Sequence, residues 1–367
     1  MAKEKKTVKI PIIISLILSI AVIILILRFT INPSDLQELL KRDIRYEFFL
    51  AAALLNVVSW FLWGLRLKIL SNAVDKNLEI GFWKSTKIVI ANLFLASITP
   101  SMAGGEPIRI HLLYKDGMKY GDATAVVLGE RLIDALFILS VIPIALYTFK
   151  NRIAGGALNI GLSIGVIAVL IFVCLFLFAI KYPEKIKVFL IFISKKTNRF
   201  FKEKKDGENR TIVYKINVEV DNFHNSMVFF LREGKKSIVF SGLLTVFMWS
   251  TAFMIPSMLL IGLGIDPFFI ESYAAQILIL VIIMMPTTPG STGVAELGIG
   301  ALYTTIIPGS QLYLIGVFVL LFRFITYHMN LIAGAIFQYR IFNSVASFSL
   351  DTIKKKKKNA HQKEGDI

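Results

Sequence analysis

Hydrophobic residues gather along this chain in long, nearly uninterrupted runs that alternate with polar stretches. Six runs are long enough to cross a bilayer as helices of about 20 residues. They cover residues 10–27, 47–65, 123–149, 156–180, 237–262 and 311–339. The pattern predicts an all-α, polytopic membrane protein with about six full transmembrane helices. The first run lacks a small-residue cleavage site, so we expect an anchor rather than a removed signal peptide.

Glycine and proline interrupt two further apolar stretches, at Thr99–Pro107 and at Pro286–Gly293, and a carboxylate lies within or just after each break. Lipid cannot satisfy unpaired backbone groups, so irregular chain at this depth survives only where protein or water surrounds it. Broken helices in corresponding places of two halves are the usual indication of a transport site.

The limbs on either side of each break predict how the chain turns. Residues 88–99 reach only about 18 Å, roughly half of a hydrocarbon core of about 30 Å. The returning limb, 106–120, carries too many charges to cross alone. We therefore predict a re-entrant helical hairpin at the first break. The second break, over 267–307, has the same plan, although its incoming limb is long enough that two short crossing helices remain an alternative.

The basic residues favour one orientation. With the first break folded as a hairpin, loops and tails on one side hold 30 Lys and Arg and those on the other side hold 6. A single crossing there would instead place the 14 basic residues of 181–236 outside. The positive-inside rule therefore predicts a multi-pass protein of the cell membrane whose N- and C-termini are both cytoplasmic.

The order of spans and breaks predicts two inverted repeats, because each half contains two spans, a broken pair and a third span. We expect a single integral membrane domain over 1–367, with repeats at 10–152 and 156–340 and a basic cytoplasmic tail at 341–367. The second repeat contains the basic loop 181–236. Amphipathic helices on the inner leaflet are one interpretation of this loop, and a disordered segment is the other.

Composition excludes several other classes. The 367 residues have a mean hydropathy of +0.67 and include 29 phenylalanines, which a soluble domain would have difficulty shielding from water. The net charge of +16 lies in loops and tails, so we expect membrane lipids as partners and no nucleic acid. The single cysteine, Cys174, permits no intramolecular disulfide. The four histidines lack metal-ligand spacing, so no metal or cofactor is predicted.

Chemistry-bearing residues cluster at the first break. Gly104 and Gly105 allow close backbone approach, and Pro107 suits the first turn of an outgoing helix whose free N–H groups favour a phosphate. Glu106 and Arg109 share a face of that helix. The alternative is that Glu106 only caps the helix and Arg109 only reaches toward lipid headgroups.

At the second break, Pro289, Gly290 and Gly293 open a helix with Glu296 in its first turn. A charge near the bilayer centre costs roughly 2.5–3.5 kcal/mol. A helix dipole returns only about 0.3–1 kcal/mol. We therefore expect a compensating partner for Glu296, and the candidates are the charged stretch Glu130–Asp134 in the third span and Arg323 in the last span.

The third span carries Glu130, Arg131 and Asp134 within one and a half turns. Structural ion pairing is one interpretation. The other is a binding site, in which Arg109, Arg131 and Arg323 hold a phosphate through their guanidinium groups. The candidate substrate-binding residues are Gly104, Gly105, Glu106, Arg109, Glu130, Arg131, Asp134, Pro289, Gly290, Gly293, Glu296 and Arg323.

Three motifs, Gly104–Arg109, Glu130–Asp134 and Pro286–Glu296, resemble in order and spacing those of the lysylphosphatidylglycerol synthase transmembrane-region family, also called flippase-like or UPF0104 membrane proteins. The resemblance implies a membrane domain that, in bifunctional members, moves an aminoacylated phospholipid between leaflets. Ser291-Thr292 stands where the family more often has Gly-Leu. The sequence stops at Ile367 without a soluble aminoacyl-transfer domain, so we do not expect synthase activity.

Two functions follow as hypotheses. The first is a translocase that moves an anionic or polyprenyl-linked lipid through a midplane cavity. The alternative is a membrane-embedded enzyme or accessory subunit in glycolipid or cell-surface polymer assembly, with Glu106, Glu130 or Asp134 as general base. No nucleotide-binding fingerprint or nucleophile–histidine pair supports an enzyme. Homo-oligomers and association with lipid-modifying enzymes remain open as partnerships, and a small-solute transporter is a third, less favoured possibility.

Overall fold

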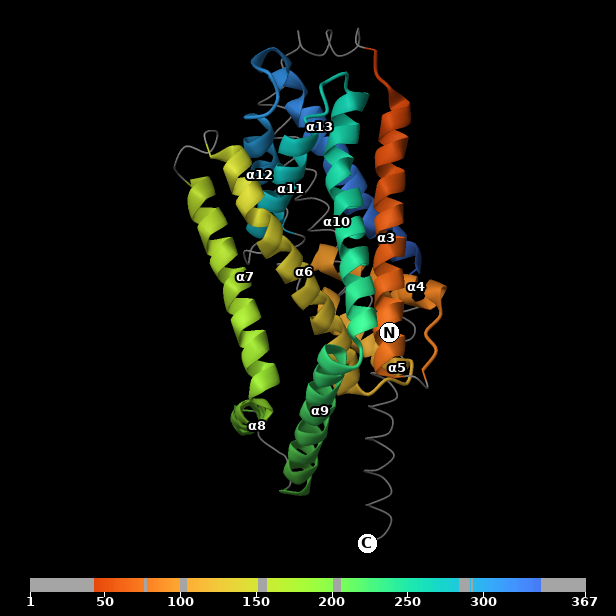
Figure 1. The fold of residues 1–367 in the computed structure, drawn as a ribbon, viewed down its shortest axis with the longest axis vertical. Coiled ribbons are helices and arrows are strands. Elements are labelled where there is room, and N and C mark those ends of the chain that lie inside the picture. Colours follow the sequence, from red (N-terminus) through yellow and green to blue (C-terminus); the bar gives the residue numbers. More distant parts are fainter. Residues whose placement is uncertain are drawn as a thin grey trace.

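Long helices dominate the computed structural model of this chain, which describes residues 43–75, 78–99, 104–150, 157–200, 206–283, 291 and 293–337. Every regular element in these ranges is a helix (Figure 1). The α-helices are α3 (Tyr46–Val74), α4 (Phe82–Ile98), α5 (Gly105–Lys115), α6 (Tyr120–Phe149), α7 (Ala157–Lys181), α8 (Pro183–Phe200), α9 (Asp206–Arg232), α10 (Lys235–Gly262), α11 (Phe269–Ile283), α12 (Val294–Tyr303) and α13 (Ile315–Arg323).

Five helices in the described residues are long and apolar enough to cross a membrane. They are α3, α6, α10, the Leu162–Lys181 part of α7 and a composite helix over Gly309–Phe337. Many of their large apolar side chains are exposed, among them Leu50 and Leu175. Lipid tails accept such side chains without cost, so this exposure fits a membrane protein. The sixth predicted run, 10–27, lies outside the described residues.

The second span was predicted to end at residue 65, and that boundary is wrong. Helix α3 continues to Val74, and α4 begins at Phe82, six residues earlier than the limb 88–99 implied. Charged residues usually end an apolar run, but Arg66 is fully buried inside α3. Its charge is neutralised by neighbouring helices, so it does not interrupt the span.

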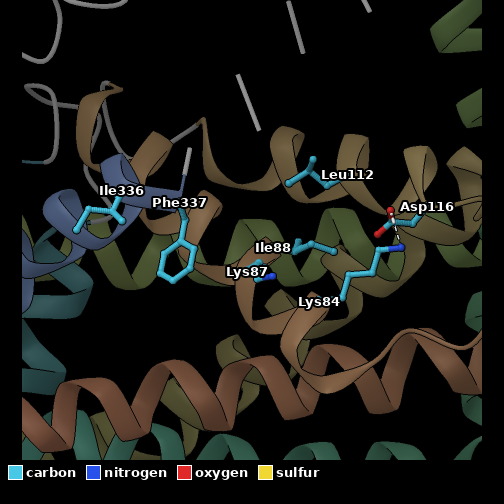
Figure 2. Close-up of a pocket in the computed structure, with 7 residues that line it drawn as sticks. All are labelled: Lys84, Lys87, Ile88, Leu112, Asp116, Ile336 and Phe337. Carbon is cyan, nitrogen blue, oxygen red and sulfur yellow. Dashed lines mark ion pairs between the residues drawn. The ribbon is translucent and has the colours of Figure 1, made fainter. Parts of the chain in front are cut away.

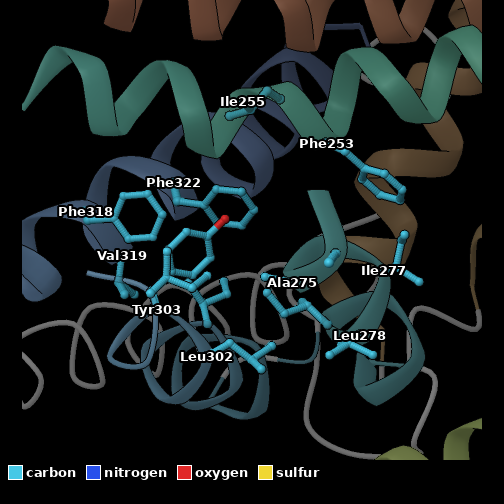
Figure 3. Packing of buried hydrophobic residues seen from close by; sticks show 14 of the residues in the cluster. Phe253, Ile255, Ala275, Ile277, Leu278, Leu302, Tyr303, Phe318, Val319 and Phe322 are labelled. Carbon is cyan, nitrogen blue, oxygen red and sulfur yellow. The ribbon is translucent and has the colours of Figure 1, made fainter. Parts of the chain in front are cut away.

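The two interrupted stretches each form a pair of shorter helices. The first pair, α4 and α5, lies toward the end of the molecule occupied by α8 and α9, and the second pair, α11 and α12, lies toward the opposite end (Figure 1). Each pair belongs to its own apolar core. In the second core, the rings of Tyr303 and Phe318 pack with centroids 4.4 Å apart, beside Phe322 (Figure 3).

The basic loop 181–236 is helical over most of its described residues, whereas its position on the inner leaflet stays a prediction. Figure 1 shows α8 nearly end-on at the foot of α7, whereas α9 runs along the bundle to α10. Lys187 on α8 donates to Asp221 on α9 at 2.7 Å and to Glu184 at the same distance. The hydrogen bonds to Asp221 and Glu184 raise the pKa of the Lys187 amine above its usual value.

The composite last helix is irregular. It begins with the 3₁₀ segment Gly309–Leu314 (η1), continues as α13, and passes through the π-helical turn Phe324–His328 (η2). The Asn56 side chain of α3 donates to the Ile325 carbonyl at 2.8 Å inside this turn. Trp60, one turn along α3, donates to Asn330 at 2.9 Å. These hydrogen bonds fix the last helix against α3.

Candidate functional site: two buried charge clusters

Three arginines and three carboxylates meet between α3, α5 and α6, and we call them the first charge cluster. Its members are Arg66, Glu106, Arg109, Glu130, Arg131 and Asp134. All five members predicted from the sequence are therefore in one place. If every group is ionised, the cluster is neutral, which is the arrangement that a low-dielectric interior requires of buried charges.

Arg66 of α3 is the centre of the first charge cluster. Its Nε donates to Glu130 Oε1 at 3.0 Å, and its Nη1 donates to Asp134 Oδ1 at 2.6 Å. Nη1 also donates to the hydroxyl of Thr245 on α10 at 2.7 Å. Both Arg66 and Glu130 are completely buried. This side chain therefore ties three long helices together through charge-assisted hydrogen bonds.

Arg109 of α5 is also completely buried and pairs with Glu130 Oε2 through its Nη1. Glu130 thus bridges Arg66 and Arg109 and uses both oxygens to do so. Within the described part of the chain, Arg109 Nε and Nη2 have no hydrogen-bond partner. Buried donors without a partner are uncommon and costly. Arg109 therefore retains two donors that a ligand or water can satisfy.

The Arg131–Glu106 pair closes the cluster on its accessible edge. Arg131 donates to Glu106 Oε1 at 2.7 Å, and its Nη1 lies 3.5 Å from Asp134 Oδ2. The two side chains are 29% and 28% exposed, in contrast to the sealed Arg66–Glu130 pair. Glu106 and Arg109 are three residues apart on α5, as predicted, but their side chains contact different residues of α6. Glu106 pairs with Arg131, and Arg109 pairs with Glu130.

An indole ring lies among all three guanidinium groups. Trp63 of α3 has its ring centroid 5.1 Å from the Arg109 guanidinium carbon, 5.5 Å from that of Arg131 and 5.9 Å from that of Arg66. Each distance is within the range of a cation–π contact. Trp63 therefore adds a cation–π contact to each of the three arginines of the cluster.

The glycines of the first break have packing roles. The Gly104 N–H already donates to the Thr99 hydroxyl at 2.9 Å, so it is not available to a phosphate. A Cβ on Gly105 would lie 2.5 Å from Asn92 Oδ1 on α4. The absence of a side chain thus allows the start of α5 to approach α4, which brings Glu106 and Arg109 to face α6.

Glu296 and Arg323 form the second charge cluster. Arg323 Nε donates to Glu296 Oε1 at 2.8 Å, and Glu296 Oε2 accepts the Gly293 N–H at 2.6 Å. Gly293 has φ 91°, a conformation that favours glycine. Glu296 is fully buried, and of its two predicted candidate partners Arg323 is the one that contacts it. Pro289 and Gly290 lie outside the described residues.

Tyr327 connects the second charge cluster to the first broken pair. The Arg323 guanidinium lies 4.2 Å from the Tyr327 ring centroid, and the Tyr327 hydroxyl donates to the Ser97 carbonyl at the end of α4 at 3.1 Å. Residues 100–103 and 284–290, which would form the tips of the two breaks, lie outside the described residues. The predicted midplane cavity therefore stays a prediction.

Four residues in or around the first charge cluster were not predicted from the sequence: Arg66, Trp63, Thr245 and Trp249. Trp249 of α10 donates to Asp134 Oδ1 at 3.1 Å. Arg66 carried a signal, because it lies at the end of an apolar run that remains helical beyond it. Thr245 and Trp249 carried none, because such residues occur in transmembrane helices without special roles.

The long apolar helices, the two broken pairs and the buried ion pairs define a polytopic α-helical membrane protein with a charged interior. The family model described as the lysylphosphatidylglycerol synthase TM region matches residues 12–334. The chain belongs to this family, as its three motifs predicted.

Two relatives carry the same description, "UPF0104 membrane protein". The one from Archaeoglobus fulgidus is 34% identical over 326 residues, which cover 88% of this chain and 94% of that protein. The one from Methanothermobacter thermautotrophicus is 31% identical over 96 residues, which cover 26% of each. No solved structure matches the chain.

Proposed function

We propose that this protein moves an anionic or polyprenyl-linked lipid between the leaflets of the membrane. The observation that carries the proposal is the Arg131–Glu106 pair, a partly exposed ion pair at the edge of an otherwise sealed charge cluster. A site that only braced the fold would have little reason to leave one of its ion pairs accessible, whereas a site for a charged headgroup needs such an edge.

The charge balance of the first charge cluster determines how a phosphate enters. All three arginines already have carboxylate partners, so an anionic headgroup cannot simply be added. The headgroup must compete with Glu106 for Arg131, because this pair is the accessible one. Glu106, once released, becomes rehydrated. The two unpartnered donors of Arg109 then supply a second contact.

The proposed topology provides a route for the lipid headgroup across the membrane. We place α4–α5 and α11–α12 as re-entrant hairpins within two inverted repeats, 10–152 and 156–340, with about six full spans. The basic end that contains α8 and α9 faces the cytoplasm of the cell, with both termini on that side. The acyl chains remain in lipid while the headgroup crosses between hairpins from opposite sides, and the repeats rock around it.

A vesicle assay tests the proposal. Full-length protein is reconstituted with headgroup- or tail-labelled fluorescent anionic and polyprenyl-linked lipids, and a membrane-impermeant quencher reports the leaflet of each lipid. Glu106→Gln removes the competing charge but leaves a hydrogen-bond acceptor, so Arg131 keeps a bound anion longer and the transport rate falls. Wild-type protein and Glu106→Gln that both flip every lipid at the protein-free rate would contradict the proposal.

The matched control is Glu184→Gln. It makes the same chemical change at an exposed carboxylate on α8, whose partner Lys187 retains Asp221. We expect wild-type rates from this variant. Equal losses in Glu106→Gln and Glu184→Gln would mean that general charge, rather than the cluster edge, sets the rate.

The enzyme alternative finds less support in the geometry. Glu130 uses both oxygens for arginines, and Asp134 Oδ1 accepts hydrogen bonds from Arg66 and Trp249. A carboxylate held in this way is a poor general base, because the oxygens that would accept a substrate proton already accept hydrogen bonds. Of the three candidate bases, only Glu106 is accessible.

A further inference from the structure

A groove lies at the basic end of the molecule, and none of its described lining residues belongs to either charge cluster. It has a volume of about 500 Å³ and is bounded by the start of α4, the end of α5 and the end of the last helix (Figure 2). Its lining residues are Lys84, Lys87, Ile88, Leu112, Asp116, Ile336 and Phe337.

The groove combines a cationic rim with an apolar wall. Lys84 and Lys87 are one turn apart on α4 and both are exposed. Lys84 reaches across to Asp116 at 2.9 Å, so one carboxylate is set against two ammonium groups (Figure 2). On the other side, Ile336 and Phe337 of the last helix expose 69% and 41% of their surfaces.

Aromatic side chains near this groove indicate where it lies relative to the membrane surface. Trp83 precedes Lys84, and Tyr114 of α5 packs against Tyr120 at the start of α6. All three aromatic side chains are exposed. Exposed Trp and Tyr at helix ends are typical of the membrane–water interface, where phosphate groups lie. The lysines therefore stand at headgroup level, and the apolar wall continues toward the acyl chains.

We propose that this groove binds one anionic phospholipid of the leaflet at the basic end. The headgroup phosphate lies between Lys84 and Lys87, and one acyl chain follows Ile336 and Phe337. Asp116 acts as an internal competitor that holds Lys84 when the groove is empty. Free phosphate satisfies only the lysines, whereas a lipid also covers the apolar wall. The inference does not depend on the proposed transport. If the protein does not move lipids, the bound lipid is a structural lipid, and if it does, the groove is an entry site.

Native mass spectrometry of the full chain, released from nanodiscs that contain phosphatidylglycerol and phosphatidylcholine, measures the retained lipids. Lys84→Gln/Lys87→Gln should retain at least about fivefold less phosphatidylglycerol, because each lysine near the surface attracts an anionic headgroup by about that factor. The matched control is Lys235→Gln/Lys236→Gln, which removes two exposed lysines from the start of α10 at the same end. We expect less than a twofold change from the control.

Asp116→Asn tests the same site in the opposite direction. It frees Lys84 from its partner without removing a cation, so phosphatidylglycerol retention should rise. This variant keeps the proposal testable even if the double lysine variant fails to fold. Equal losses from the two double variants, or no rise with Asp116→Asn, would overturn the proposal.

Two further arms identify the ligand and separate this site from transport. Phe337→Ala should weaken phosphatidylglycerol retention without changing any charge, and inorganic phosphate in excess should fail to displace the lipid. Displacement by inorganic phosphate, or unchanged retention in Phe337→Ala, would mean a simple anion site and overturn a lipid site. Flip rates are measured on the same preparations. If the groove variants lose lipid retention but flip lipid at the wild-type rate, the groove site is supported and is separate from transport. If they retain lipid but no longer flip it, the groove is not the lipid-binding site, and the proposed transport is unaffected.

Discussion

Glu130 is the residue on which the first charge cluster depends most, and Glu130→Gln is the sharpest test of that conclusion. The carboxylate is completely buried and accepts hydrogen bonds from both Arg66 and Arg109. Substitution by glutamine preserves size and one acceptor but removes the negative charge. Arg66 keeps Asp134, whereas Arg109 loses the only carboxylate with which the described residues pair it.

The magnitude follows from these contacts. Each hydrogen bond to a charged group contributes about 1.5–3 kcal/mol. Removing one partner of a buried ion pair costs about 3–5 kcal/mol, because the other charge remains in the interior. We expect Glu130→Gln to lower the free energy of unfolding by that amount. Glu106→Gln breaks a partly exposed pair and should cost only about 0–1 kcal/mol.

Equilibrium unfolding in mixed micelles, followed by circular dichroism, measures both variants. The double variant Arg109→Gln/Glu130→Gln removes both buried charges and should recover part of the loss, so the double-mutant cycle gives a coupling energy between the two residues. If Glu130→Gln is no less stable than Glu106→Gln, or if the cycle shows no coupling, the buried network does not hold the helices together as its geometry indicates.

Two further predictions concern helix packing and the second charge cluster. Gly165→Ala should destabilise the protein by about 1–3 kcal/mol in the same unfolding assay, because its Cβ would lie 2.5 Å from the Val281 carbonyl oxygen. Gly242→Ala, whose Cβ would meet nothing within 4 Å, is its control and should instead be neutral or stabilising; equal losses would count against close packing of α7 on α11. Arg323→Gln should cost about 3–5 kcal/mol, because buried Glu296 loses its cation. The pair Glu296→Gln/Arg323→Gln should be more stable than the single variant, and a less stable pair would contradict this account.

Hydropathy predicted the long spans well because it depends on one property, the length of an apolar run. The predicted span 237–262 corresponds to α10, which differs only by starting at Lys235. The same measure failed at Arg66, because hydropathy scores each residue separately. It takes no account of the partner of Arg66, Glu130, which lies 64 positions further along the chain. Charged residues that are neutralised across helices are therefore the places where such boundaries err.

The candidate site was predictable where helix geometry brings residues together, and not where tertiary packing does. Arg131 and Asp134 are three apart on one helix, and their side chains do meet at 3.5 Å. The convergence of Glu106 on Arg131 required the angle between α5 and α6, which depends on how Gly105 packs against α4. No local pattern contains that information.

The π-helical turn in the last helix has a consequence for how this protein tolerates changes of length. In the turn, the Met329 N–H bonds five residues back to the Phe324 carbonyl, so one extra residue is accommodated. In a regular α-helix, loss of one residue rotates everything beyond it by about 100°, whereas loss of the extra residue here converts the turn into regular α-helix and keeps both flanking segments in register. Arg323 lies before the turn and Asn330 after it, and each has its own partner, Glu296 and Trp60. A single-residue deletion within the turn therefore keeps both anchors, and the last helix tolerates the loss of a residue there better than in a regular α-helical stretch.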